Sequence, residues 1–389
     1  MKPVVLVSGI TKVTANQIKK DLQKKLYKDS FVWEYVESLN AKIKSELNYC
    51  SIIIWQENNN DSIKFEDIKQ RFPSALIFVI VEELSEFIID GINDKKFFKV
   101  VKNNFDPALL VRFIEEGFSF WNEQRKNEKQ NKNIEKETLK KELEIAQEIQ
   151  KNLLPNDSIK WKNLELECFS ESAKNVGGDF YTYYGMQNDR ALISKHIVAV
   201  GDVSGKGISA ALIMATAISH IDNSMQMNLK LSDRAVFLDK LLTPLTKPQR
   251  QNCAVCLVEF VGVNTNRAFI KVVNAAFIPP YLKRKNGEVE WIASKGFALG
   301  QGLGMQFGYK EMTVGIEKGD IIVLVSDGII EANNEINELL GFERFYSILE
   351  EAPNDSAKKM LSYIQKKISQ YTNDSDQNDD RTIVVIRFH

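Results

Sequence analysis

The chain has 389 residues, of which 44% are hydrophobic and 26% are charged, and its formal net charge is -1. This length allows two or three domains, and the composition is that of a globular protein with a substantial core. The near-zero net charge excludes a general electrostatic attraction to nucleic acid or to membrane surfaces. The sequence has neither an apolar run of membrane-spanning length nor a signal-peptide pattern. We therefore expect a cytoplasmic protein without nucleic-acid or membrane partners.

Residues 1–120 alternate short apolar stretches with amphipathic ones. Strands are predicted over residues 4–7, 31–36, 51–55, 75–81 and 98–101. Helices are predicted over residues 14–26, around Ile43 and Leu47, and over residues 107–120. Because fully apolar strands that alternate with helices are typical of parallel sheets, this region is predicted to be a doubly wound α/β domain.

This pattern resembles a response-regulator receiver domain, with Lys102 in the place of the lysine that follows the fifth strand. The resemblance puts Ser8 where receivers have an acid pair, Trp55 or Gln56 where they have the phosphoacceptor aspartate, and Glu82 where they have a hydroxyl. Without an acid cluster there is no Mg²⁺ site and no aspartyl nucleophile. We expect a pseudo-receiver regulatory domain. The alternative is a generic α/β domain that only mediates association.

Residues 121–154 are predicted to form a helical linker. Its first part is rich in charged residues, Asn and Gln and has no Gly or Pro, and Pro155 closes the helix. The residues that recur at alternating steps of four and three are Leu139, Leu143, Ala146, Gln150 and Leu153, with Ile145 and Ile149 on a flanking stripe. This seam favours a dimeric coiled coil, and hence a homodimer through the linker helix. The alternative is a single amphipathic helix that packs on the following domain.

Residues 155–389 are predicted to be rich in strands. The predicted strands cover residues 164–169, 197–202, 253–260, 268–274, 281–283, 321–326 and 383–388, and the predicted helices cover residues 209–223, 235–242, 341–350 and 356–370. This order suggests two stacked antiparallel sheets with helices outside them, an α+β domain. Cys253 and Cys256 fall on one strand, where a three-residue offset points the two sulfurs to opposite faces, so we expect packing residues and not a metal site.

Acidic residues stand at the edges of several of these strands. Asp202 ends an apolar strand and is followed by the glycine-rich turn of GDVSGKG, Asp179 follows two glycines in VGGDF, and Asp327 follows an apolar strand in SDG. Asp379 and Asp380 precede the last strand. Carboxylates gathered at one edge repel one another unless cations lie between them, and sets of oxygen ligands suit Mg²⁺ or Mn²⁺.

The order VGGDF, GDVSGKG, PP, LG, GD…SDG and DDRT resembles the bacterial SpoIIE/RsbU-type branch of the metal-dependent protein phosphatases, the type 2C superfamily. The resemblance runs from about Leu139 to Phe388. It implies a serine/threonine phosphatase with two Mn²⁺ or Mg²⁺ ions. Its implied substrate is a phosphoprotein, an anti-anti-sigma-type regulator.

Carried over by position, the resemblance implies that Asp202 bridges both metals and that the Val203 carbonyl is a further ligand. Asp179 would bind one metal, and Asp327 and Asp379 the other, with Asp380 as the less favoured alternative to Asp379. Asp202 and Asp179 are thus the expected catalytic centre, where a metal-activated water attacks phosphorus. Lys206 is a candidate to contact the phosphate, the alternative being that it only caps the turn toward solvent.

Three departures from the family pattern accompany these matches. Thr182 stands where many members have an acid, residues 274–280 read NAAFIPP where many have NAGHNPP, and Ser326 replaces the threonine of TDG. None removes an expected ligand. The alternative functions are a catalytically inactive phosphatase-like scaffold and an adaptor whose output is dimerisation.

Overall fold

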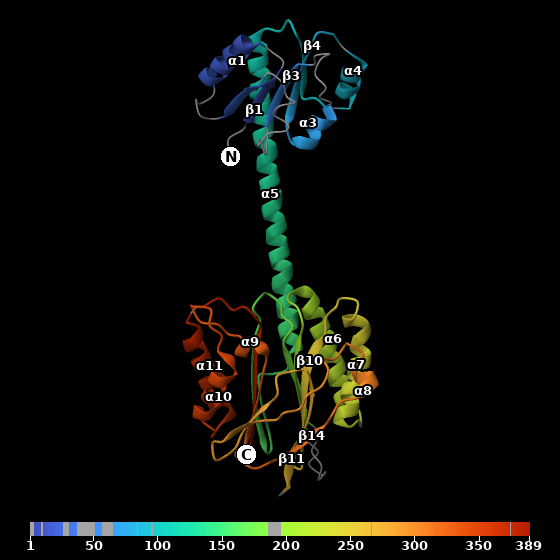
Figure 1. Ribbon diagram of the computed structural model, residues 1–389, viewed down its shortest axis with the longest axis vertical. Coiled ribbons are helices and arrows are strands. Elements are labelled where there is room, and N and C mark those ends of the chain that lie inside the picture. Colours follow the sequence, from blue (N-terminus) through green and yellow to red (C-terminus); the bar gives the residue numbers. More distant parts are fainter. Residues whose placement is uncertain are drawn as a thin grey trace. The chain divides into compact units, whose positions relative to one another are not determined.

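The computed structural model describes residues 4–8, 11–25, 31–36, 51–56, 65–83, 85–94, 96–185, 196–265, 267–373 and 375–389. The chain divides into two compact units, Met1–Thr138 and Leu139–His389 (Figure 1). None of the helices in these ranges is long and apolar enough to cross a bilayer.

The first unit is built on a parallel five-stranded sheet of order β2-β1-β3-β4-β5. Its strands are β1 (Val4–Ser8), β2 (Val32–Val36), β3 (Ile52–Gln56), β4 (Leu76–Val81) and β5 (Lys99–Lys102). Its helices are α1 (Lys12–Lys25), α3 (Phe65–Arg71), α4 (Glu86–Asn93) and the start of α5 (Pro107–Leu153). The helix predicted around residues 43–47 lies outside the described residues.

Both faces of this sheet are covered, as the apolar strands require. Along β3, Ile53 belongs to one buried cluster, and Ile52 and Ile54 belong to the cluster on the opposite face. The predicted parallel doubly wound sheet is therefore present. The predicted end of the last helix at residue 120 is wrong, because α5 continues without interruption to Leu153. No proline interrupts it, and Pro155 follows its end.

The second unit contains two antiparallel sheets. The first has the order β14-β11-β10-β9-β8, and the second has the order β13-β12-β15-β16-β7-β6. The strands of the first are β8 (Phe180–Gly185), β9 (His196–Val203), β10 (Cys253–Val261), β11 (Ala268–Ala275) and β14 (Met312–Ile316). Those of the second are β6 (Ser158–Trp161), β7 (Leu164–Glu171), β12 (Tyr281–Lys283), β13 (Val289–Trp291), β15 (Ile321–Val325) and β16 (Arg381–Phe388).

Helices cover the outer faces of both sheets. In Figure 1, α6 (Ile208–Met225) and α7 (Leu231–Thr246) flank one sheet, and α10 (Gly341–Glu351) and α11 (Ala357–Thr372) flank the other. Two short helices, α8 (Gly304–Phe307) and α9 (Asp327–Ile330), complete the unit. The prediction of two stacked antiparallel sheets with helices outside is confirmed. Strands β6, β8, β13 and β14 and helices α8 and α9 were not predicted from the sequence.

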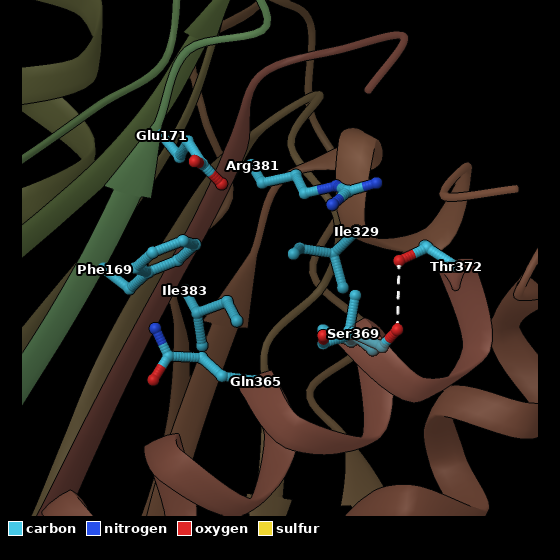
Figure 2. Close-up of a pocket in the computed structure, with 9 residues that line it drawn as sticks. Phe169, Glu171, Ile329, Gln365, Ser369, Thr372, Arg381 and Ile383 are labelled. Atoms are coloured by element: carbon cyan, nitrogen blue, oxygen red, sulfur yellow. Dashed lines mark hydrogen bonds between the residues drawn. The ribbon is translucent and has the colours of Figure 1, made fainter. Parts of the chain in front are cut away.

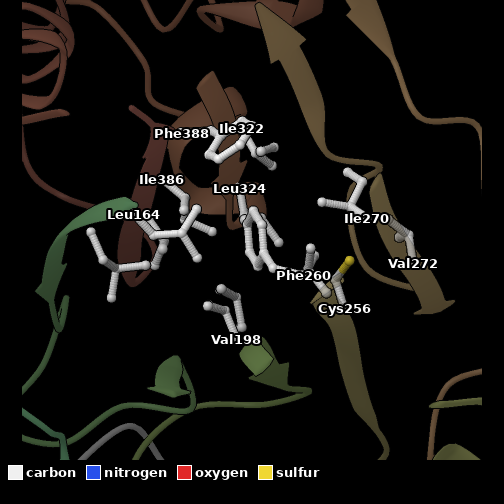
Figure 3. Packing of buried hydrophobic residues seen from close by; sticks show 14 of the residues in the cluster. Leu164, Val198, Cys256, Phe260, Ile270, Val272, Ile322, Leu324, Ile386 and Phe388 are labelled. Carbon is white, nitrogen blue, oxygen red and sulfur yellow. The ribbon is translucent and has the colours of Figure 1, made fainter. Parts of the chain in front are cut away.

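The central core of this unit lies between the two sheets (Figure 3). Because side chains alternate along a strand, Val198 and Val200 of β9 enter this core, whereas Ile197 and Ala199 pack against α6 and α7. The same alternation places Cys256 in the central core and Cys253 in the outer helical layer, as predicted. Burial raises the pKa of both thiols, so they are inert packing groups.

Candidate active site

Asp202 lies near the end of β9, opposite Ala254 of β10. After β9 the chain turns sharply into α6, and Gly205 and Gly207 have φ angles of 93° and 87°, which L side chains rarely adopt. Burial, together with the charges of Asp327, Asp379 and Asp380, raises the pKa of Asp202 to about 7. Asp202 is therefore held in a place where a negative charge is unfavourable unless a cation balances it.

Asp179 directly precedes β8 and is only 6% exposed. Its Oδ2 atom is buried without a hydrogen-bond partner. Burial and the neighbouring Asp202 raise the pKa of its carboxyl well above the ordinary value. A buried acid with an unused oxygen, next to a second acid, has the character of a metal ligand.

Asp327 is the first residue of α9, so the sequence-based placement of Ser326 in a strand is corrected: β15 ends at Val325 and Ser326 is the N-cap. The chain turns here because Ser326 is bonded to the start of β16. Its N–H donates to the Thr382 carbonyl (3.0 Å) and its Oγ accepts from the Thr382 N–H (2.9 Å). Burial, followed by the charge of Asp379, raises the pKa of Asp327.

The adjacent acids Asp379 and Asp380 have different surroundings. The Asp380 carboxylate accepts hydrogen bonds from the Ala173 N–H (2.8 Å) and the Gly178 N–H (2.7 Å), so it anchors the loop before Asp179. The Asp379 carboxylate instead forms an ion pair with Lys206, with 2.9 Å between Nζ and Oδ2. Lys206 Nζ also donates to the Asn378 carbonyl (2.5 Å), and the bond to Asp379 raises the pKa of Lys206. Lys206 thus lies within the acidic cluster.

The double glycine before Asp179 allows close approach of the backbone. A Cβ at Gly177 would lie 2.1 Å from the Asp380 carboxylate, and a Cβ at Gly178 would lie 2.5 Å from the Val203 carbonyl oxygen and 3.3 Å from Asp202 Oδ1. No side chain therefore fits between the two chain segments. This contact brings the strand end that contains Asp202 and Val203 next to the loop that contains Asp179.

The donors of this cluster fit a hard cation. They are all oxygens, Asp179 has an unpartnered buried oxygen, and the pKa values of Asp179, Asp202 and Asp327 are all raised. Within the described ranges, no three histidine, cysteine or acidic side chains already form a complete metal-binding group. Since carboxylates repel one another, a bound cation is needed to draw them to ligand distance.

Two hollows lie near the start of β16, and Arg381 lines both. One, of about 160 Å³, is bounded by Lys206, Asp379, Asn378 and Leu339, among others. The other, of about 250 Å³, lies between the β7–β16 strands and α11. Figure 2 shows Glu171 and Arg381 at one end of it and Gln365 of α11 at the other. The smaller hollow adjoins the acidic cluster and is the candidate approach for a substrate.

The sequence did not show the contacts that several residues make at this site. Gln150 is bonded to the loop before Asp179, Asp380 anchors this loop, and Ser326 joins two acid-bearing segments. At one departure from the family pattern, Thr182 donates a hydrogen bond to Asp222 of α6 (2.6 Å). At another, Asn274 closes a turn by pairing with both backbone polar groups of Phe277.

The fold is shared with a solved phosphatase domain. The SiaA-PP2C domain of Pseudomonas aeruginosa matches with a TM-score of 0.54 at 22% identity, over 65% of this chain and 98% of that domain. Two stacked antiparallel sheets between helix pairs are thus the fold that this chain shares with a PP2C phosphatase domain.

The chain belongs to the SpoIIE family, since the model of the family described as Stage II sporulation protein E (SpoIIE) matches residues 194–389, just over half of the chain. Phosphoserine phosphatase RsbU of Bacillus subtilis (strain 168) is 28% identical over 253 residues, which cover 64% of this chain and 70% of RsbU. Phosphoserine phosphatase RsbP of the same organism is 22% identical over 249 residues, which cover 64% of this chain and 58% of RsbP.

Proposed function

We infer that this chain is a protein serine/threonine phosphatase that hydrolyses phosphoserine or phosphothreonine on a partner protein in bacterial signalling. The observation that supports this most directly is the cluster of acids with raised pKa values in a chain of the SpoIIE family. The similarity to RsbU and RsbP favours a phosphoserine substrate. We propose an anti-anti-sigma-type regulator as the substrate protein.

We propose that the site holds two Mn²⁺ or Mg²⁺ ions. Asp202 would bridge them, the Val203 carbonyl and Asp179 would serve one side, and Asp327 and Asp379 the other. When bound, the two cations lower the pKa of a water toward neutral and offset the charge on the phosphoryl oxygens. The unpartnered Oδ2 of Asp179 and the absence of a Cβ at Gly178 support this arrangement.

We propose that Lys206 contacts the phosphate of the substrate, in addition to its ion pair with Asp379. In the structure its ammonium group neutralises Asp379. Since its side chain is 40% exposed at the rim of the hollow beside Asp379, it is placed to meet a phosphate as a point charge when the carboxylate binds a cation. Lys206 would then orient the phosphoryl group and take no proton from it.

The N-terminal unit is proposed to be a pseudo-receiver that regulates the phosphatase. Its parallel strand order β2-β1-β3-β4-β5 supports the doubly wound fold. The described residues at the carboxyl ends of its strands include Ser8, Gln56 and Lys102, none of which can form an acyl phosphate. We also propose a homodimer through the linker helix, supported by the exposure of Ile145 (58%) and Ile149 (59%) on α5.

Phosphate release from a phosphoserine peptide tests the proposed activity. Wild-type protein should be active with Mn²⁺ or Mg²⁺ and inactive in EDTA. Because a bridging ligand serves both cations, Asp202→Ala should lower the rate more than Asp179→Ala, each in a folded protein. Full activity after metal removal, or near wild-type turnover of Asp202→Ala, would contradict the proposal.

A further inference from the structure

Gln150 is a buried polar residue in the last turns of α5. It is 9% exposed, while its neighbour Ile149 is 59% exposed. Its Nε2 donates to the Gly177 carbonyl at 2.7 Å, and its Oε1 accepts from the Gly177 N–H at 3.1 Å. One side-chain amide therefore pairs with both backbone polar groups of a single residue. The same Nε2 lies 3.5 Å from the sulfur of Met214 on α6.

The residue it holds has no side chain of its own to anchor it. Gly177 and Gly178 must both be glycine, because a Cβ at either position would overlap Asp380 or the Val203 carbonyl. These two glycines contribute no side-chain packing, so backbone hydrogen bonds hold them in place next to the buried side chain of Val176. Gly178 is bonded to Asp380 at 2.7 Å and to the Val203 N–H at 3.3 Å. Gln150 supplies the bonds on the remaining side.

Asp179 depends on this loop for its direction. Its carboxylate is buried and its Oδ2 has no hydrogen-bond partner, while the Ser326 and Thr382 side chains interact with the rest of the carboxyl group. The path of the backbone through Gly177 and Gly178 sets the position from which the Asp179 side chain extends, and so contributes to where this oxygen lies. The peptide that Gln150 holds lies two residues before Asp179.

We propose that Gln150 is a positioning residue of the active site: by pairing with Gly177 it fixes the loop that presents Asp179 to the cation. The proposal rests on the proposed metal-dependent activity. It also explains a polar residue in the apolar seam of α5, where a buried amide is unfavourable unless its hydrogen bonds are satisfied. Residues that orient a metal ligand typically contribute about 10- to 100-fold to metal affinity or activity.

The test compares Gln150→Met with the matched control Gln147→Met in the full chain. Methionine keeps the length and flexibility of glutamine but makes no strong hydrogen bond. Gln147 lies one turn earlier on the same helix and is exposed. Mn²⁺ binding is measured by electron paramagnetic resonance, and the half-activating Mn²⁺ concentration, kcat and KM are measured with a phosphoserine peptide.

We expect Gln150→Met to weaken Mn²⁺ binding and to raise the half-activating concentration by about tenfold. KM at saturating Mn²⁺ should change little, and Gln147→Met should match the wild type. A folded Gln150→Met protein with wild-type Mn²⁺ affinity would overturn the inference. If Gln150→Met does not fold, Gln150→Asn replaces it with the same expectation, since its shorter amide cannot reach both polar groups of Gly177.

Measuring Mn²⁺ binding to the Asp202→Ala variant separates this inference from the proposed function. If the wild type does not bind Mn²⁺, or Asp202→Ala binds it equally well, the proposed metal site is wrong. If Asp202→Ala abolishes binding while Gln150→Met retains it, only the role of Gln150 is refuted.

Discussion

Replacing Asp202 by Asn removes a carboxylate whose charge is unfavourable in the folded protein when no cation is bound. Burial and three neighbouring acids raise its pKa from an ordinary value of 3.8 to about 7. One pKa unit corresponds to about 1.4 kcal/mol, so the shift sets an upper limit of roughly 4 kcal/mol. Because Asp202 is only partly buried and its neighbours relax, we expect Asp202→Asn to stabilise the metal-free protein by about 2 kcal/mol at pH 8.

The sign of this effect depends on pH. A raised pKa means that the folded state holds the proton more tightly than the unfolded state, so below pH 3.8 Asp202 contributes no penalty. Between pH 3.8 and about 7 the unfolded state ionises first, and stability falls as the pH rises. Above about pH 7 Asp202 is ionised in both states, and the full unfavourable free energy of its charge in the folded protein is present. The wild type should thus lose stability in EDTA between pH 5.5 and 8, and Asp202→Asn should lose less.

Urea unfolding in EDTA at both pH values measures this difference. Asp376→Asn, which removes an exposed acid from the loop before β16, is the control and should behave like the wild type. Mn²⁺ should stabilise the wild type and leave Asp202→Asn nearly unchanged, because a ligand stabilises only the state that binds it. If Asp202→Asn is less stable than the wild type in EDTA at pH 8, the reasoning about this cluster is refuted.

Three further outcomes are expected. Lys283→Met should lower the free energy of unfolding by about 2–3 kcal/mol, because the buried Lys283 ammonium donates to the Leu349, Glu350 and Ala352 carbonyls and methionine removes this shared donor. An unchanged urea midpoint would contradict this. Acetyl phosphate should leave no acyl-phosphate label within residues 1–120, and a stable label there, detected by mass spectrometry, would disprove the pseudo-receiver. An insertion of seven residues near Glu137 turns the apolar stripe of the helix by only about 20°, and it should preserve the phosphatase rate and the sedimentation behaviour. An insertion of four residues turns the stripe by about 40° and should change the basal activity. If the two insertions behave equally, the helix only connects the two units and does not regulate the phosphatase.

The sequence alone determined the elements whose side chains follow a strict period. The apolar strands of both units, the opposite faces of Cys253 and Cys256, and the stacked antiparallel sheets follow from alternation along the chain. The sequence of a few consecutive residues was sufficient to predict these elements, because hydrophobic alternation is a local property of the chain. The missed strands, such as β14, are short or contain glycine, and their pairing partners hold them in place.

Only the tertiary structure decided how the acids are held. Asp379 and Asp380 are neighbours in the sequence, yet one pairs with Lys206 and the other binds the backbone of Ala173 and Gly178, about 200 residues earlier. Gln150 looks from its spacing like one more member of a helical seam, and its contact with Gly177 lies 27 residues away. These roles depend on hydrogen bonds between segments far apart in the chain. No local pattern encodes them, because a buried polar group is satisfied by whichever segment the packed sheets bring within reach.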